Sequence, residues 1–138
     1  MSEWLYEDKP IDETILDNYH GFVYLIENTL TGKQYYGKKR LKFIRSKKLK
    51  TQKRKIKVVT DSDWKDYYGS SNELLADVEL LGKDKFKRTI IRFCKSKGEC
   101  SYWELWYQMT HHVLMHPTDF YNNYVGARIH RKHVLKKA

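Results

Sequence analysis

Apolar and polar positions follow two different periods along the chain, which predicts strands and helices in one small domain. Two tyrosine-bearing apolar runs, at residues 22–27 (FVYLIE) and 33–37 (KQYYG), flank the polar sequence ENTLTG and predict a β-hairpin. A later run, at residues 86–94 (FKRTIIRFC), predicts a third strand. We therefore expect an α+β fold, in which a small three-stranded antiparallel sheet is flanked by helices.

Two stretches carry the signals of helix ends. In SSNELLADVELLG, Ser70 and Glu73 have the spacing of a capping box, and Gly82 is a natural stop. In SYWELWYQMTHHVLMH, Ser101 starts a longer helix that ends before Pro117. Both stretches have an apolar side, so we expect these helices to cover the sheet.

The segment after the hairpin is strongly basic, because twelve of the twenty residues from Lys38 to Lys57 are Lys or Arg. Apolar residues at positions 41, 44 and 49 are spaced as in a helix, so we expect a basic helix followed by an exposed basic loop at residues 50–57. The expected organisation is an acidic N-terminal extension (1–20), a core domain (21–125) with a basic insertion (38–60), and a basic C-terminal tail (126–138).

Charge is distributed unevenly over the 138 residues, whose formal net charge is +10. Residues 1–20 hold six acidic residues and one lysine, whereas residues 21–60 hold thirteen basic residues and one acidic residue. Such asymmetry favours a polyanionic partner that binds the second segment. A solvated basic loop that only aids solubility is the alternative.

Composition argues against several classes of protein. No window approaches the ~20 apolar residues of a membrane span, and the acidic start is not a signal peptide, so we expect a cytoplasmic protein without a membrane partner. Cys94 and Cys100 are too few for a disulfide framework or a thiolate metal site. His112 and His116 share a helical face, but no HExxH pattern accompanies them, so zinc is not predicted.

The triplets FVY (22–24) and YYG (35–37) resemble, in variant form, the two motifs of the GIY-YIG endonuclease family. Tyr24 and Tyr35 are eleven residues apart, an interval typical of that family. The family also has an arginine ten residues after the second motif tyrosine, on a helix, then a glutamate on a later helix and an asparagine near the end of the domain. These positions are matched by Arg45, Glu104 and Asn122, with Asn123 as an alternative to Asn122.

The resemblance has departures from the family pattern. Phe22 replaces the first glycine and Tyr36 the central isoleucine, and both residues suit a β-strand. A histidine that some members carry one turn after the arginine falls near Leu49, so its role is vacant or is filled by the hydroxyl of Tyr67 or Tyr68. Other stretches, such as DWKDYYGSS, look like those of stand-alone, homing-endonuclease-like members from bacteriophages and mobile elements.

The resemblance implies a metal-dependent DNA endonuclease with one active site per protomer. It implies that Glu104 holds one Mg²⁺ or Mn²⁺ ion, that Tyr24 helps to deprotonate the attacking water, and that Tyr35 orients the water or the phosphate. Arg45 would bind phosphate oxygens, and Asn122 would connect the end of the domain to the site. Metal-assisted hydrolysis also agrees with the residues themselves, because no Ser-His-Asp set or activated cysteine is apparent.

A tyrosine base needs help from its surroundings. A free phenol has a pKa near ~10, which makes it a poor base at neutral pH. We therefore expect the cations Lys38, Lys39 and Arg45 to lower the pKa of Tyr24.

The expected partner is double-stranded DNA. Cutting both strands with one active site requires a second protomer or sequential nicking, so a homodimer on DNA is possible. The residues expected to bind phosphates are Lys38, Lys39, Arg40, Lys47, Lys48, Lys53, Arg54 and Lys55.

Each assignment has a structural alternative. The motif tyrosines could simply pack on a sheet face, and Glu104 lies three residues after Ser101, where it could complete a capping box. Arg40 competes with Arg45 for the phosphate, and Asn122 could be a turn former. For the whole protein, the alternatives are a non-catalytic nucleic-acid-binding module that keeps the fold and a small RNA-associated protein of the ribosomal type.

Overall fold

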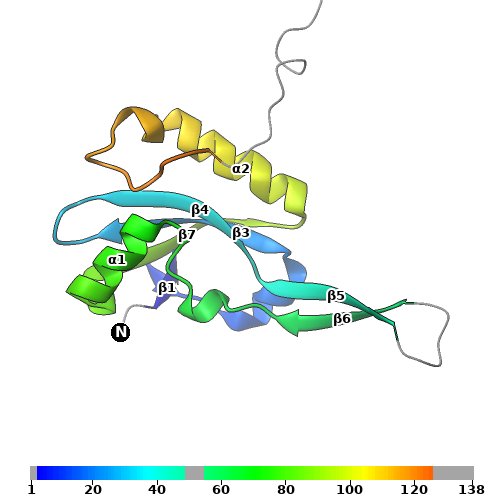
Figure 1. Ribbon diagram of the computed structural model, residues 1–138. Helices are drawn as coiled ribbons and strands as arrows, with labels where there is room; N and C mark the ends of the chain where they lie inside the picture. Colours follow the sequence, from blue (N-terminus) through cyan, green and yellow to red (C-terminus); the bar gives the residue numbers. More distant parts are fainter. Residues whose placement is uncertain (1–2, 49–54, 126–138) are drawn as a thin grey trace, which may run out of the picture.

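A five-stranded sheet forms the centre of the fold (Figure 1). The computed structural model describes residues 3–48 and 55–125, and its main sheet has the strand order β2-β1-β7-β3-β4. β3 pairs antiparallel with β4 and with β7, whereas β1 runs parallel to β7. The strands are β1 (Trp4–Tyr6), β2 (Lys9–Pro10), β3 (Gly21–Asn28), β4 (Gln34–Arg40) and β7 (Phe86–Cys94).

The predicted hairpin and third strand are confirmed as β3, β4 and β7, but the prediction of a three-stranded sheet is wrong. β1 and β2 come from residues 1–20, which the sequence presented as an extension. Trp4 is 4% exposed, and its indole N–H donates a hydrogen bond to the Trp64 carbonyl at 2.7 Å. Strands of three and two residues are too short to show an alternating pattern, which is why the sequence did not reveal them.

A separate hairpin stands where the basic helix was predicted. β5 (Lys42–Lys48) pairs antiparallel with β6 (Lys55–Asp61), and the hairpin projects from the body of the molecule (Figure 1). Leu41 was counted toward the apolar side of a helix, but it is 2% exposed in the main core. Position 44 lies opposite Val59 on the next strand, and local spacing cannot reveal such pairing. The predicted loop is therefore also wrong for residues 55–57, and residues 49–54 lie outside the described part of the chain.

The first α-helix, α1 (Asn72–Leu81), begins one residue later than the capping box predicted. Its N-cap is Ser71, whose hydroxyl accepts a hydrogen bond from the Leu74 N–H, so Ser70 lies outside the helix. Gly82 ends the helix as predicted, with a φ of 97° that favours glycine.

The second α-helix, α2 (Lys97–Thr110), begins before the predicted start. Its N-cap is Ser96, whose hydroxyl accepts a hydrogen bond from the Glu99 N–H, so Ser101 lies within the helix. Within residues 3–48 and 55–125, no helix has the length and apolar character needed to cross a membrane. The shorter 3₁₀ helices are η1 (Glu13–Asn18), η2 (Trp64–Asp66), η3 (Lys83–Lys85) and η4 (Val113–Met115).

The two α-helices lie on opposite faces of the sheet, so that the protein has two cores (Figure 1). Phe22, Tyr24 and Ile26 of β3 belong to the larger core, which includes apolar residues of α1. Val23 of β3 belongs to the smaller core beneath α2, with Cys94. This division follows from the alternation of side chains along a strand.

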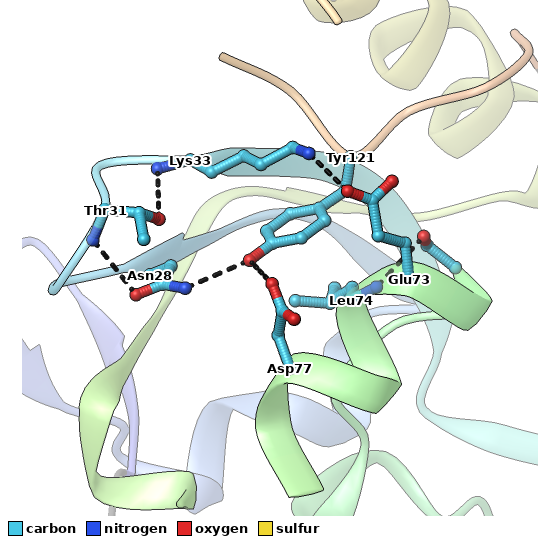
Figure 2. Close-up of polar contacts among 8 residues, drawn as sticks. Asn28, Thr31, Lys33, Glu73, Leu74, Asp77 and Tyr121 are labelled. Carbon is cyan, nitrogen blue, oxygen red and sulfur yellow. Dashed lines mark hydrogen bonds and ion pairs between the residues drawn. The ribbon is translucent and has the colours of Figure 1, made fainter. Parts of the chain in front are cut away.

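The segment after η4 returns to the edge of β4. The Gln34 N–H donates to the Asp119 carbonyl, and the Tyr121 N–H donates to the Gln34 carbonyl, both at 2.8 Å. The Tyr121 hydroxyl donates to Asp77 Oδ2 at 2.7 Å and accepts from Asn28 Nδ2 at 3.1 Å (Figure 2). These contacts join the returning segment to the β3–β4 turn and to α1.

Candidate active site

Tyr24 lies within the main sheet, with its hydroxyl over the neighbouring strand. It pairs with Gly37 of β4 and is 1% exposed. A Cβ atom at position 37 would lie 2.4 Å from the Tyr24 hydroxyl oxygen, much closer than atoms can approach. The YYG triplet therefore ends in glycine because Tyr24 fills the space of a side chain there.

The surroundings of Tyr24 raise the pKa of its hydroxyl well above 10. Burial is the largest cause, and charge on Tyr67, Tyr35 and Glu104 and a hydrogen bond with Tyr67 act in the same direction. The expectation that nearby cations lower this pKa is wrong, because burial dominates. Tyr24 is therefore a neutral phenol at pH 7, able to donate or accept hydrogen bonds.

Tyr35 lies beside Tyr24. The centres of the two rings are 6.1 Å apart. The Tyr35 hydroxyl forms a hydrogen bond with Ser70 Oγ at 2.9 Å, and burial raises the pKa of Tyr35 despite this bond. Ser70, predicted as a helix cap, instead fixes the position of the Tyr35 hydroxyl.

Tyr67 is one of the two residues that the sequence offered as a substitute hydroxyl, and it lies against Tyr24. Its ring centre is 6.0 Å from that of Tyr24, and the two hydroxyl groups are hydrogen bonded. Lys39 Nζ lies 4.2 Å from the centre of the Tyr67 ring. Tyr68 is instead in contact with Arg88, whose guanidinium carbon lies 4.1 Å from its ring centre. Of the two candidates, Tyr67 is the one that contacts Tyr24.

Glu104 reaches the edge of β4 from α2, on the other face of the sheet. It is 9% exposed, and its carboxylate accepts a hydrogen bond from the Lys38 backbone N–H. Burial raises the pKa of Glu104 above 4.5, while the Lys38 ammonium and this hydrogen bond act in the opposite direction. Because α2 begins after Ser96, the capping-box alternative for Glu104 is wrong.

The outer edge of β4 holds the site residues in register. Along a strand, N–H groups point to the same edge at every second residue. At positions 34, 36 and 38 they donate to the Asp119 carbonyl, to Asn122 Oδ1 at 3.1 Å and to the Glu104 carboxylate. Asn122 Nδ2 also donates to the Tyr36 carbonyl at 2.8 Å. Asn122 thus fastens the returning segment to the strand that carries YYG, whereas Asn123 is exposed.

Lys38 and Glu104 border a cleft of about 260 Å³ beside β4. Tyr24 is not part of its wall, whereas Tyr35, whose ring lies beside that of Tyr24, is. A second cavity, of about 410 Å³, lies around Trp4 and Arg88 and shares no lining residue with the first. The wall of the first cleft includes Tyr35, Lys38, Ser70, Glu104, Gln108 and Asn123.

Arg45 lies on β5 and not on the expected helix. Its backbone pairs with that of Val58 on β6. Two residues before Arg45, the centre of the Phe43 ring lies 5.3 Å from Lys39 Nζ, so the start of β5 lies next to the end of β4. The side chain of Arg45 lies outside what the structure describes, and its role stays a prediction.

The other residues expected to bind phosphate are spread over two regions. Lys38 borders the cleft, Lys39 contacts Tyr67, and Arg40 is exposed at the end of β4. Lys47 and Lys48 belong to β5 and Lys55 belongs to β6, but their side chains lie outside what the structure describes. Lys53 and Arg54 lie outside the described residues altogether.

Gln108 is a cleft residue that the sequence reading did not single out. It lies one helical turn after Glu104 and is 3% exposed. The four-residue spacing, which puts both side chains on one side of a helix, was the available signal.

Comparison with family models identifies the chain. The model described as "Putative endonuclease segE, GIY-YIG domain" matches residues 4–125, which is most of the sequence. The chain belongs to this GIY-YIG family. The match begins at β1, in agreement with a sheet that includes the N-terminal strands. No curated protein and no solved structure matched the chain. Membership of a GIY-YIG endonuclease family implies nuclease activity in general, with DNA as the substrate class.

Proposed function

We propose that this GIY-YIG protein hydrolyses DNA phosphodiester bonds with the help of a divalent metal ion in the cleft beside β4. One observation carries the proposal: Glu104 of α2 and Tyr35 and Lys38 of β4 line the same cleft. These groups are the kinds needed to hold a cation, contact a phosphate and orient a water molecule.

The donor atoms of the cleft suit Mg²⁺ or Mn²⁺. They are carboxylate, amide and hydroxyl oxygens from Glu104, Asn123, Tyr35 and the neighbouring serines, and such oxygen donors are typical ligands of these ions. In the part of the chain that the structure describes, no three His, Cys, Asp or Glu residues form a metal-binding group. A single carboxylate with retained waters fits Mg²⁺, which takes few protein ligands. When bound, the ion would make a water more acidic and offset phosphate charge.

The side chains around the cleft have separate roles in this proposal. The Lys38 ammonium, which donates to Ser101 Oγ at 2.6 Å, lies where it can bind a phosphate oxygen. Tyr35 orients the phosphate or the attacking water through its hydroxyl. Tyr24 acts as a neutral hydroxyl behind Tyr35, and its hydrogen bond to Tyr67 offers a path along which a proton can move.

The β5–β6 hairpin is the proposed DNA-binding element. It projects from the body of the molecule, and the segment from Phe43 to Thr60 contains eight Lys and Arg residues. A two-stranded β-ribbon fits into the major groove of B-DNA, and cationic side chains along it can bind phosphates. Two copies on one duplex, or two successive nicks, would cut both strands.

Plasmid cleavage tests the proposal. Supercoiled plasmid should be nicked or linearised with Mg²⁺ or Mn²⁺, and a chelator should stop the reaction. Glu104→Gln should lose cleavage and still bind DNA, because the substitution removes the charge but keeps the shape. Full cleavage by this variant would exclude Glu104 as the metal ligand.

The same assay separates the catalytic proposal from a binding module. A protein that binds duplex DNA with a steep salt dependence but cuts it with no divalent ion would be a non-catalytic module with this fold. A strong preference for RNA over duplex DNA would favour an RNA-associated role instead.

A further inference from the structure

The two ends of the Gln108 amide differ in their hydrogen bonding. Its Nε2 donates to the Tyr36 carbonyl at 3.1 Å, and the same carbonyl accepts from Asn122 Nδ2 at 2.8 Å. Its Oε1 is buried and accepts no hydrogen bond from the described residues. A buried carbonyl oxygen without a partner costs free energy, so natural proteins rarely keep one without a use.

The position of this oxygen indicates the use. Gln108 lies four residues after Glu104 on α2, and both side chains line the cleft beside β4. Residues at this spacing lie above one another on one side of a helix. The side chain that carries the unsatisfied oxygen is therefore the neighbour of Glu104, whose carboxylate is proposed to hold the cation.

A divalent cation with one protein carboxylate keeps several waters, and the protons of those waters need acceptors. We propose that Gln108 is a positioning residue whose Oε1 accepts a hydrogen bond from a water that hydrates the cation held by Glu104. This inference rests on the proposed function. Because Oε1 is buried, a small shift of the cleft side chains must accompany the entry of that water.

A purely structural role makes a different prediction. In that case Gln108 serves only to hold the Tyr36 carbonyl, as Asn122 also does. A variant that keeps an oxygen acceptor at position 108 but loses the donor to Tyr36 would then behave like a variant that loses the whole amide. If Oε1 binds hydration water, removing the Gln108 oxygen alone should weaken cation binding.

Binding of Mn²⁺ to the full chain without DNA tests the inference, with the free ion measured by electron paramagnetic resonance. Gln108→Met keeps the length of the side chain but has no amide oxygen, and it should bind Mn²⁺ about 10-fold more weakly than the wild type. Gln34→Met is the matched control, because it makes the same substitution at a glutamine whose amide donates to Glu27 Oε1 and does not border the cleft. Its Mn²⁺ affinity should stay within about 2-fold of wild type once folding is verified by circular dichroism. Equal losses in the two variants, or no loss in Gln108→Met, would overturn the inference.

A second variant keeps the test decisive if Gln108→Met does not fold. Gln108→Glu retains an oxygen acceptor and loses the donor to Tyr36, so it should bind Mn²⁺ at least as tightly as wild type. Weaker binding would reject the inference, as would a wild-type chain that does not bind Mn²⁺. Failure of the proposed function looks different: Mn²⁺ would bind with the expected pattern, but plasmid would stay intact.

Discussion

Position 37 cannot accept a side chain unless Tyr24 moves. Gly37→Ala would place a methyl carbon only 2.4 Å from the hydroxyl oxygen of Tyr24. We expect a loss of about 1–3 kcal/mol in the free energy of unfolding, because overpacked cores relax only by shifting side chains or backbone. Urea denaturation measures this change.

The matched control is Gly98 of α2, where an added Cβ would meet nothing within 4 Å. Gly98→Ala should raise the free energy of unfolding by up to about 1 kcal/mol, since alanine is a better helix former. Equal effects of the two substitutions would contradict the steric role of Tyr24.

Glu104 should weaken the fold at neutral pH. Burial raises its pKa in the folded chain, so its protonated form is favoured there relative to the unfolded chain. The free energy of unfolding is therefore unaffected by this shift below the pKa of Glu104 in the unfolded chain. It falls as the pH rises from there through the pKa in the folded chain. Glu104→Gln should therefore be more stable than wild type at pH 7, and this gain should vanish near about pH 3, where the glutamate is protonated in both states. Urea denaturation at the two pH values checks the difference, and a gain of equal size at both would mean that charge is not its cause.

Several candidate site residues could be named from the sequence because the resemblance to the GIY-YIG family supplies their type and order. Tyr35 and Glu104 do border one cleft, and Asn122 does bind the strand that carries YYG. The direction of the Tyr24 pKa shift could not be predicted, because it depends on burial by residues from distant parts of the chain. Gln108 was missed because a lone glutamine in a helix has no signal apart from its spacing.

The elements show where local patterns are sufficient. Long, regular segments such as β3, β7 and α1 were predicted because their patterns extend over several residues. The β5–β6 hairpin was not, because its strands depend on pairing with each other. The start of α2 was misplaced because Ser96 and Ser101 both fit the local rules for a cap, and only the packing of the helix decides between them.

The hairpin should be removable without loss of the fold. Two hydrogen bonds outside residues 43–60 hold the base of the hairpin together. The Ser62 N–H donates to the Leu41 carbonyl at 2.9 Å, and Ser62 Oγ donates to the Arg40 carbonyl at 2.6 Å. Replacing residues 43–60 by Asn-Gly should leave a cooperative unfolding transition. DNA affinity should fall, because eight Lys and Arg residues are lost.

The salt dependence of DNA binding measures how many of these residues contact phosphates. If about half of them do, the slope of log affinity against log salt should become less steep by about 4. An unchanged slope in the shortened protein would place the DNA on another surface.

At the scale of the whole molecule, the N-terminal strands β1 and β2 are part of the main sheet, and Trp4 is part of the main core. The ring of Trp4 lies 5.0 Å from that of Phe22 and 5.4 Å from that of Tyr24, so it belongs to the core around the site. Trp4→Ala should lower the free energy of unfolding by about 3–5 kcal/mol, because it removes a large buried side chain. Glu3→Ala, at an exposed neighbour, should change it by less than about 0.5 kcal/mol. A loss below about 1 kcal/mol for Trp4→Ala would show that residues 1–20 are a dispensable extension after all.

The contacts along β4 also determine how copies of the protein can meet. An outermost strand with unused amide groups is a template on which another chain can add, which leads to swapped dimers or aggregates. Here the amides at positions 34, 36 and 38 are already occupied, one by the returning backbone and two by the side chains of Asn122 and Glu104. Glu104, Asn122 and the returning segment thus also block this route of self-association. Two copies gathered on one duplex can therefore act side by side without their β4 strands merging into a continuous sheet.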